Sequence, residues 1–301
     1  MYSNKNQITF INRENEIELK DFLLNNDISN RLYRSLYQNK RIYKNGAPLT
    51  KDFIVKKNDI ITIFFEDEVS DIQPQEMDID IVYEDDDIIV VNKPPFILVH
   101  PTKNYPDNTL SNGVAFYFKQ NNLKRKIRIV NRLDRDTSGL VIFAKNQFAH
   151  QQMALQLEDG RLEKYYYAIV EGLVNDDEGI IEQPIAQKID SYGREIREDG
   201  DYSKTYYKVL ERLTDITLLK VKTFTGRTHQ IRVHLDFIGH PIIGDSLYHQ
   251  KNDFINRQAL HASSLIFYQL RTKSKIELVT DIPEDMKSLL KRYKSVFIEK
   301  R

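Results

Sequence analysis

The sequence predicts an α+β protein: a large domain around a mixed, largely antiparallel sheet with flanking helices, preceded by a small α+β domain. After residue 80, short apolar runs typical of strands outnumber helical segments, which argues against a doubly wound fold. A length of 301 residues is compatible with two domains of this kind. An acidic stretch separates two regions of different character, so we expect a small domain at residues 1–65, a linker at 66–79 and a large domain at 80–301.

The small domain is predicted from helix and turn signals. Residues 16–24 have helical spacing of apolar residues, and Ser29 is a good N-cap for a second helix that carries Leu32 and Leu36 on one face. The sequence Lys44-Asn45-Gly46 is typical of a tight turn between two strands. Residues 53–55 and 59–65 complete the expected strands.

The large domain is predicted to alternate short strands with helices. Strands are expected at residues 88–91, 140–144, 165–170, 206–210, 216–221 and 275–279, and helices at 110–118, 147–158, 228–238 and 284–292. No glycine-rich dinucleotide motif and no P-loop is present, so a nucleotide cofactor is not expected.

Composition excludes several classes of protein. The chain has no cysteine, which excludes a disulfide scaffold and any cysteine-ligated metal site and fits a reducing compartment. No apolar run approaches the roughly 20 residues that span a bilayer, and residues 1–13 are too polar for a signal peptide. We therefore expect a cytoplasmic protein with no membrane partner.

The net charge of zero conceals an uneven distribution. Residues 66–87 contain 11 acids and no Lys or Arg, and the rest of the chain carries a net charge of +11. Bases cluster at residues 31–57 and 124–135. Clustered bases are the electrostatic footprint of phosphate binding, although a solvated charged surface has the same composition.

Asp134 is the leading candidate for chemistry. It lies between Arg132 and Arg135 and precedes a Thr-Ser-Gly turn and an apolar run that begins at Leu140. Nearby cations favour the charged form of a carboxylate, so Asp134 is expected to be ionised at neutral pH. A charged, oriented aspartate can be a nucleophile, or simply one half of a structural salt bridge.

Two further clusters contain unusual combinations of residues. Residues 164–172 read as a strand in which Tyr166 shares a face with Lys164 and Ala168, because side chains two apart point the same way. Residues 225–235 read as a tight glycine turn followed by a helix that begins near Thr228. A helix start with Arg227 and Arg232 nearby favours an anion, either a phosphate or Asp134 itself.

These clusters resemble the signature motifs of the RluA-type pseudouridine synthases, enzymes that isomerise uridine in RNA. The similar stretches are residues 131–140 (His-Arg-Leu-Asp-x-x-Thr-Ser-Gly-Leu in the family), 164–172 (Lys-x-Tyr-x-Ala-x-x-x-Gly), 225–234 (Thr-Gly-Arg-x-His-Gln-Ile-Arg-x-His) and 239–245 (Gly-His-Pro-Ile-x-Gly-Asp), with weaker matches at 82–85, 91–94, 99–101 and 257–262. The resemblance covers about residues 78 to 295. Asn131 stands where the family more often has His, and Phe96 where it often has Gly.

The resemblance implies an RNA pseudouridine synthase with Asp134 as the essential acid. Asp134 would attack the anomeric carbon or stabilise an oxocarbenium-like species by its charge. Tyr166 would stack on the uracil, and would act as a base only beside a cation, since its ordinary pKa is near 10. Arg232 is expected to form the ion pair that orients Asp134. A target uridine inside folded RNA would have to be flipped into the pocket.

Residues 1–65 resemble an S-four-like RNA-binding domain, so the expected partner is RNA. At the family level this is ribosomal RNA of the large subunit. The candidate RNA-binding residues are Arg132, Arg135, Lys164, Arg227, His229, Arg31, Arg34, Lys40, Arg41 and Lys44. The simplest expectation for the oligomeric state, which the sequence leaves open, is a monomer.

No cofactor and no metal is expected, because the isomerisation is internal and redox-neutral. The spacing of His229, His234, His240 and His261 does not form a zinc-binding motif. Gly226 and Gly244 are expected to be turn glycines with positive φ. Two other functions stay open at this point. A non-catalytic RNA-binding protein would not need Asp134, Tyr166 and Arg232 together, and a glycosidase or phosphoryl-transfer enzyme would need paired carboxylates or a metal.

Overall fold

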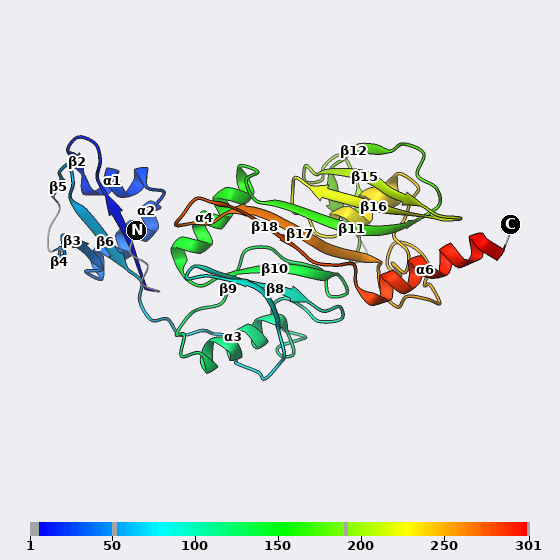
Figure 1. Cartoon of the computed structure of the whole chain (residues 1–301), viewed down its shortest axis with the longest axis horizontal. Coiled ribbons are helices and arrows are strands. Elements are labelled where there is room, and N and C mark those ends of the chain that lie inside the picture. Colours follow the sequence, from blue (N-terminus) through cyan, green and yellow to red (C-terminus); the bar gives the residue numbers. More distant parts are fainter. Residues whose placement is uncertain (1–5, 50–52, 190–191, 300–301) are drawn as a thin grey trace.

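The computed structural model describes residues 6–49, 53–189 and 192–299, and it shows an elongated α+β molecule with the N-terminal module at one end and the last helix at the other (Figure 1). We use the name N-terminal module for residues 7–65. The predicted fold class is confirmed, because the larger part of the chain surrounds one ten-stranded mixed sheet. No helix in the described part of the chain is both long enough and apolar enough to cross a membrane.

The N-terminal module packs two helices on a four-stranded sheet. The helices are α1 (Leu19–Asn25) and α2 (Asn30–Gln38). The sheet has the order β1 (Gln7–Ile11), β6 (Ile60–Phe64), β3 (Ile42–Lys44) and β4 (Ala47–Pro48), while β2 (Ile17–Glu18) pairs with β5 (Ile54–Val55). The Ser29 side chain accepts a hydrogen bond from the Leu32 amide at 3.2 Å, which confirms the predicted cap. Asn45 and Gly46 have φ of 48° and 86°, which confirms the predicted turn.

The large sheet places two distant halves of the chain side by side. Its main path is β12 (Glu178–Glu182), β15 (Lys204–Arg212), β16 (Ile216–Thr223), β11 (Glu163–Glu171), β17 (Leu260–Tyr268), β10 (Ser138–Ala144), β8 (Ile88–Lys93) and β7 (Asp80–Glu84). The strand β18 (Lys275–Val279) pairs with β17, β9 (Arg128–Ile129) pairs with β10, and β13 (Ile185–Gln187) pairs with β14 (Arg194–Ile196) outside the sheet. The helices are α3 (Leu110–Gln120), α4 (Gln147–Glu158), α5 (Gln230–Phe237) and α6 (Glu284–Glu299).

Strand β10 is buried along its whole length because both of its faces are covered. Val141 and Phe143 belong to the same apolar cluster as residues of α3, and Leu140 and Ile142 belong to a second cluster with residues of α4. This alternation is the period of two expected of a strand, with apolar residues on both faces. The arrangement fixes β10 rigidly, and with it the turn that precedes it.

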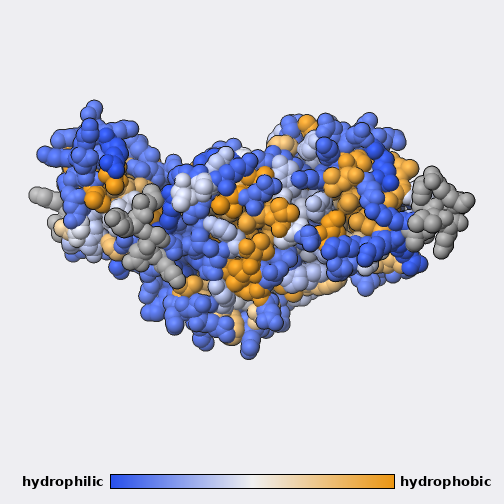
Figure 2. All heavy atoms as spheres, viewed as in Figure 1, coloured by the Kyte–Doolittle hydropathy of each residue, from blue (hydrophilic) through white to orange (hydrophobic). Residues whose placement is uncertain are grey.

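The N-terminal module is attached to the large domain by apolar and polar contacts. The rings of Phe65 and Phe148 stack with centroids 6.3 Å apart. The Gln152 side chain donates to the Asp27 carbonyl oxygen at 2.8 Å, and Arg271 donates to the Gln7 carbonyl oxygen at 2.9 Å. On the face seen in Figure 2, the module is mainly hydrophilic, whereas apolar side chains gather over the middle and the far end of the large domain.

The acidic segment at residues 66–79 contains no helix or strand, and it runs along the large domain. Asp71 forms an ion pair with Lys126 at 2.7 Å, and Asp67 forms one with Lys124 at 3.4 Å. Glu68 pairs with Arg128. For Lys124, Lys126 and Arg128 these pairs favour the charged-surface alternative, and phosphate binding by the whole cluster at residues 124–135 stays a prediction. The acids that precede these three bases in sequence neutralise them in space.

Strand β17 was missed by the sequence reasoning although it lies in the centre of the sheet. Its first half carries His261, Ser263 and Ser264, which are buried, and such polar residues do not read as a core strand. His261 hydrogen-bonds with the hydroxyls of Ser138 and Thr280, and Ser263 donates to the Tyr165 carbonyl oxygen. These partners make the burial of both polar side chains possible. Pattern reasoning fails here because the partners come from other strands.

Gly139 permits the parallel contact between β10 and β17. Its φ is 114°, and a Cβ at this position would lie 2.2 Å from the carbonyl oxygen of Ala262. Only a residue without a side chain allows the two backbones to approach so closely. Gly139 thus sets the spacing of the sheet directly after the turn that contains Asp134.

We expect Gly139→Ala to lower the free energy of unfolding by about 2–6 kcal/mol, because backbone strain and overpacking each cost about 1–3 kcal/mol. The matched variant is Gly160→Ala, since Gly160 also has positive φ, of 79°, but a Cβ at that position would have nothing within 4 Å. That variant should lose only about 1 kcal/mol. Urea unfolding measures both, and equal losses would show that the close approach at Gly139 is unimportant.

Candidate active site

Asp134 lies in a tight turn that leads into β10. The turn is closed by a hydrogen bond from the Thr137 amide to the Asp134 carbonyl oxygen, at 3.2 Å. It starts three residues and ends two residues before the predicted Thr137-Ser138-Gly139 turn, since Ser138 already pairs in the sheet. The Asp134 side chain is about a quarter exposed, so the carboxylate is accessible although its backbone is enclosed.

Lys93 fixes the backbone around this turn by hydrogen bonds. It is fully buried at the end of β8, and its ammonium donates to the carbonyl oxygens of Pro94, Ile97 and Arg135 at 2.8–2.9 Å. Burial lowers the pKa of Lys93 to about 7, although the charges of Asp136 and Asp134 oppose the change. The residue after Asp134 is thus tied to β8 through a buried lysine.

Each of the next three residues along the chain is fastened by a different side chain from residues 257–261, which lead into and begin β17. The contacts are Arg257 with the Asp136 carbonyl oxygen (3.3 Å), Gln258 with the Thr137 hydroxyl (3.1 Å) and His261 with the Ser138 hydroxyl (2.9 Å). Arg257 is in turn held by Asp285, which starts α6 (2.6 Å). The peptide that carries Asp134 therefore has little freedom to move.

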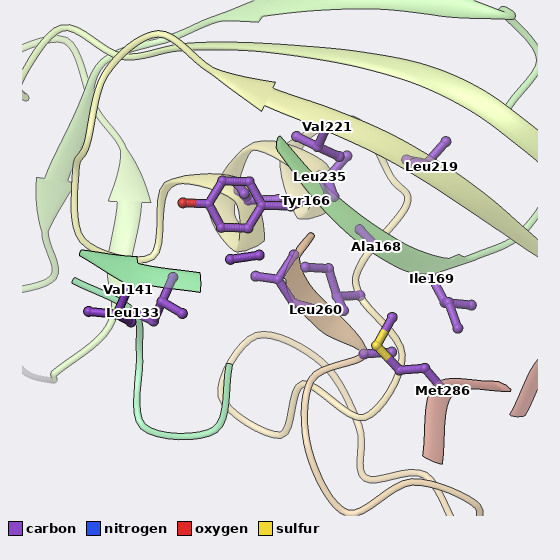
Figure 3. Close-up of a cluster of buried hydrophobic side chains, with 14 of the residues drawn as sticks. Leu133, Val141, Tyr166, Ala168, Ile169, Leu219, Val221, Leu235, Leu260 and Met286 are labelled. Atoms are coloured by element: carbon purple, nitrogen blue, oxygen red, sulfur yellow. The ribbon is translucent and has the colours of Figure 1, made fainter. Parts of the chain in front are cut away.

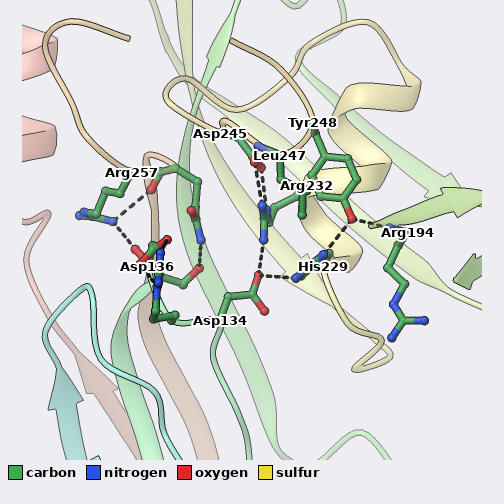
Figure 4. Close-up of polar contacts among 12 residues, drawn as sticks. Asp134, Asp136, Arg194, His229, Arg232, Asp245, Leu247, Tyr248 and Arg257 are labelled. Atoms are coloured by element: carbon green, nitrogen blue, oxygen red, sulfur yellow. Dashed lines mark hydrogen bonds and ion pairs between the residues drawn. The ribbon is translucent and has the colours of Figure 1, made fainter. Parts of the chain in front are cut away.

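Arg232 forms the central ion pair of the site (Figure 4). Its guanidinium binds Asp245 in bidentate fashion, at 2.6 and 2.7 Å, and donates from Nη1 to Asp134 Oδ2 at 3.0 Å. Burial opposes the charge of Arg232, but its hydrogen bonds with Asp245 and the charges of Asp245 and Asp134 outweigh burial and raise its pKa above the usual range.

The carboxylate of Asp134 is in excess over the positive charge of the ion-pair group. Asp245 is fully buried and neutralises Arg232, so the three groups together carry one negative charge. Both contacts to the Asp134 carboxylate go to Oδ2, and no described residue bonds to Oδ1. The site thus presents one oriented carboxylate oxygen toward open space.

His229 and Tyr248 complete the surroundings of Asp134. The Tyr248 hydroxyl accepts from the Arg194 amide at 2.7 Å and hydrogen-bonds with His229 Nδ1 at 2.8 Å, and the Tyr248 ring lies 4.9 Å from the Arg232 guanidinium carbon. Burial lowers the pKa of His229, although Asp134 opposes the change. His229 is therefore neutral at pH 7, and its Nε2, 3.9 Å from Asp134 Oδ2, makes a dipolar contact with it.

Tyr166 lies on β11 beside the apolar core (Figure 3). Its ring packs among aliphatic side chains such as Leu133 and Leu260, and its hydroxyl points away from them. Lys164, Tyr166 and Ala168 are all buried, as the predicted shared face requires. Burial raises the pKa of Tyr166 to about 12, so the free protein holds a neutral phenol and does not support the basic role.

A cavity of about 650 Å³ brings these groups together. Among the residues that line it are Asp134, Tyr166, Arg232, Lys164 and Thr223. The volume is in the range of small-molecule and nucleotide sites. A larger cavity of about 850 Å³ lies against β1 and contains none of the candidate catalytic residues.

The other candidate RNA-binding residues have different surroundings. In the large domain, Arg132, Arg135 and Arg227 all line the cavity. Arg227 also lies 3.7 Å from Asp201, and Arg135 pairs with Asp136 at 2.8 Å. In the N-terminal module, Arg31, Arg34 and Lys40 are exposed, whereas Arg41 pairs with Glu66 and Lys44 with Asp59.

The two departures from the family motifs have structural explanations. Asn131 donates to the Leu140 carbonyl oxygen at 3.2 Å and accepts from the Ile142 amide at 2.8 Å, so it fastens the start of β10. Phe96 has φ of 70°, a left-handed conformation that glycine adopts without strain. The expectation of positive φ holds for Gly244 and is wrong for Gly226.

Sequence reasoning missed Lys93, Asp245, Tyr248 and Arg257 as parts of the site, although three of them lie in motifs that it quoted. The sequence contained two signals of a buried charge. Lys93 follows a run of β-branched residues, and Asp245 follows a Pro-Ile-Ile-Gly segment. The helix α5 begins at Gln230, slightly later than predicted, because His229 adopts φ of 58° as its N-cap. Within the described ranges, no group of three His, Asp or Glu residues is arranged to hold a metal.

Comparison with known proteins agrees with this geometry. A family model described as RNA pseudouridylate synthase matches residues 87–237. An uncharacterized RNA pseudouridine synthase of Bacillus subtilis is 38% identical over 273 residues, which cover 88% of this chain and 89% of that protein. Ribosomal large subunit pseudouridine synthase D of Haemophilus ducreyi is 34% identical over 238 residues, covering 74% of this chain and 73% of that protein. The structure of human RNA pseudouridylate synthase domain containing 1 superposes with a TM-score of 0.58 at 25% identity, covering 72% of this chain and 95% of that one.

We expect His261 to make stability depend on pH. Burial, with help from Arg257, lowers its pKa from 6.5 to about 4. The unfolded chain thus binds a proton that the folded chain excludes, and stability present above pH 6.5 is lost as pH falls toward 4, by up to about 3 kcal/mol. Urea unfolding at several pH values should show a flatter dependence for His261→Gln than for the unsubstituted protein.

The control is Thr280→Val, which removes the hydroxyl that bonds to His261 Nε2 at 2.9 Å and leaves the imidazole in place. It should lower stability by a similar amount at every pH. Parallel curves for the unsubstituted protein and His261→Gln between pH 6.5 and 4 would contradict the assignment.

Proposed function

This chain belongs to the RluA-type RNA pseudouridine synthases and is an RNA pseudouridine synthase, and on that premise we propose that Asp134 carries the chemistry and that the substrate is ribosomal RNA of the large subunit. The observation that carries the proposal is the Asp134 carboxylate, held by one oxygen and open at the other, at the wall of a nucleotide-sized cavity. Isomerisation breaks the bond between C1′ and N1 and forms one between C1′ and C5. The proton on C5 leaves to solvent, and N1 gains a proton.

Asp134 is suited to act at C1′ because its negative charge persists beside a neutralised arginine. Positive charge develops on the ribose as the glycosidic bond breaks, and a fixed carboxylate stabilises it or captures it as a covalent bond. The carbonyl clamps on residues 135 and 136 keep the carboxylate in one position. Little reorganisation is then needed during the reaction, which is the condition for efficient electrostatic catalysis.

Arg232 acts as a positioning residue in this proposal. Two of its donors are used by Asp245 and a third by Asp134 Oδ2. A planar guanidinium fixes the directions of all three bonds, which a lysine would not do. The orientation of the free Asp134 oxygen thus follows from the position of α5.

Tyr166 provides the surface on which the uracil would pack. A neutral, buried phenol ring with its hydroxyl directed away from the core offers an apolar face to a base and a polar edge to its oxygens. The uridine must leave its stack to reach this ring, at a cost of a few kcal/mol, which contacts in the cavity would offset.

Ribosomal RNA of the large subunit is proposed because relatives named as ribosomal large subunit pseudouridine synthases are 32–35% identical over most of this chain. Mapping pseudouridines in total RNA from cells with and without this protein would identify the target. A missing pseudouridine in another class of RNA would overturn the choice of RNA and leave the enzyme assignment intact.

We expect Asp134→Asn to reduce isomerisation by at least about 1,000-fold and to leave RNA affinity nearly unchanged. The amide keeps the hydrogen bond to Arg232 but lacks the charge. Tritium release from RNA labelled at C5 of uridine measures the reaction, and filter binding measures affinity.

The matched control is Asp136→Asn, the same chemical change two residues away, where the carboxylate pairs with the exposed Arg135. It should retain most of the activity. Substantial pseudouridine formation by Asp134→Asn would refute the catalytic role.

The N-terminal module is proposed to bind RNA through α2. Arg31 and Arg34 are exposed on this helix, and no ion pair holds them in the described part of the chain. Arg41 and Lys44 are partly neutralised by acids, so they would contribute less.

We expect the double variant Arg31→Gln/Arg34→Gln to weaken RNA binding and to reduce the slope of log affinity against log salt by about two, one for each lost phosphate contact. Lys124→Gln/Lys126→Gln removes the same charge from bases that pair with Asp67 and Asp71, and should leave the slope unchanged. Equal slopes for the two double variants would remove α2 from the RNA interface.

A further inference from the structure

Lys164 is a buried cation without a counter-charge. Only 6% of its surface is exposed, and in the described part of the chain its ammonium makes no ion pair and no hydrogen bond. Burial is the only cause that lowers its pKa, to about 8, and no acid opposes the change. Other buried cations of this protein, such as Arg232 and Lys93, have several partners each.

A second unsatisfied donor lies directly opposite. Thr223 of β16 faces Lys164 of β11 in the antiparallel register, so the two side chains emerge on the same face of the sheet. Thr223 is 7% exposed, and its hydroxyl makes no hydrogen bond of acceptable geometry to any described residue. The hydroxyl lies near the Tyr166 phenol, and this contact opposes the rise that burial causes in the pKa of Tyr166.

Both groups line the cavity that contains Asp134. A Cβ at Gly226 would lie 3.6 Å from the Lys164 ammonium, so the loop that leads to α5 passes beside it. A carboxylate at this point would have neutralised the lysine, and none is present among the described residues. A buried charge and a buried hydroxyl are both costly when left unpaired, so their retention indicates that a ligand satisfies them.

We propose that Lys164 and Thr223 form an oxyanion subsite that holds an anionic oxygen of the target nucleotide. The inference rests on the proposed function and adds to it a second anchor, separate from Asp134. Two oxygens of one nucleotide have the required chemistry. One is a phosphate oxygen beside the flipped uridine, and the other is a uracil carbonyl oxygen, which becomes negatively charged when the bond between C1′ and N1 breaks and the electron pair stays on the base.

The first test uses stability and needs no RNA. Lys164→Met keeps the length of the side chain and removes the charge, so it should raise the urea midpoint of unfolding above that of the unsubstituted protein. The matched variant is Lys222→Met. Lys222 lies on the neighbouring position of β16 and pairs with Glu163 at 2.6 Å, so its loss should lower the midpoint or leave it unchanged. A lower midpoint for Lys164→Met would show that the lysine serves the fold, and would overturn the proposal.

The second test uses tritium release from total RNA of cells that lack this protein, labelled at C5 of uridine. Lys164→Met should lower kcat/KM at least 30-fold and Thr223→Val about fivefold, while Lys222→Met stays within twofold. The double variant should lose less than the product of the single losses, because both groups bind one oxygen. Activity within twofold of the unsubstituted protein for Lys164→Met would overturn the proposal.

The kinetic pattern identifies the oxygen. A phosphate contact predicts weaker binding and a salt slope smaller by about one, with kcat nearly unchanged. A uracil contact predicts a lower kcat with unchanged affinity for RNA. If Asp134→Asn stayed active, the proposed function would fail, whereas the midpoint of Lys164→Met would still report on the subsite.

Discussion

The site depends on one buried guanidinium between two carboxylates. Arg232 is nearly inaccessible to solvent, and a charge in that position is tolerable only when its donors are satisfied. Asp245 satisfies two donors and supplies the opposite charge, which leaves Asp134 as an extra anion that shares the same cation. The arrangement ties α5 to the turn before β10, and so it joins the two halves of the sheet at the point where the cavity opens.

Side chains hold the backbone of the turn before β10 in place. Lys93, Arg257, Gln258 and His261 each fasten a different residue between 135 and 138, and Gly139 lets β17 approach closely enough for this to happen. Lys93 is far in sequence from the other three groups, and none of the four lines the cavity. Their common effect is to limit the motion of Asp134, which is what a preorganised electrostatic site requires.

The cavity also contains two groups that the fold leaves unsatisfied, Lys164 and Thr223. By contrast, the buried guanidinium groups of Arg257 and Arg271 pair with carboxylates. Paired buried cations stabilise the free protein, whereas Lys164 and Thr223 are proposed to find their partner in RNA. The charge distribution follows the same division, because the acidic segment neutralises bases near residue 126 but does not pair with those on α2.

The sequence by itself determined the fold class, the strand that carries Tyr166 and the bounds of α4, because short-range periodicity is written locally. The pairing of Asp134 with Arg232 was expected from the resemblance to the family motifs, and the structure contains it. The sequence also indicated the two helices and the turn of the N-terminal module. Only the tertiary structure decided that β17 is a central strand, that Asp245 and Lys93 belong to the site, that the bases near residue 126 are neutralised and that Tyr166 is a neutral phenol. These properties depend on burial and on partners up to 123 residues away, and neither is encoded in the neighbourhood of a residue along the chain.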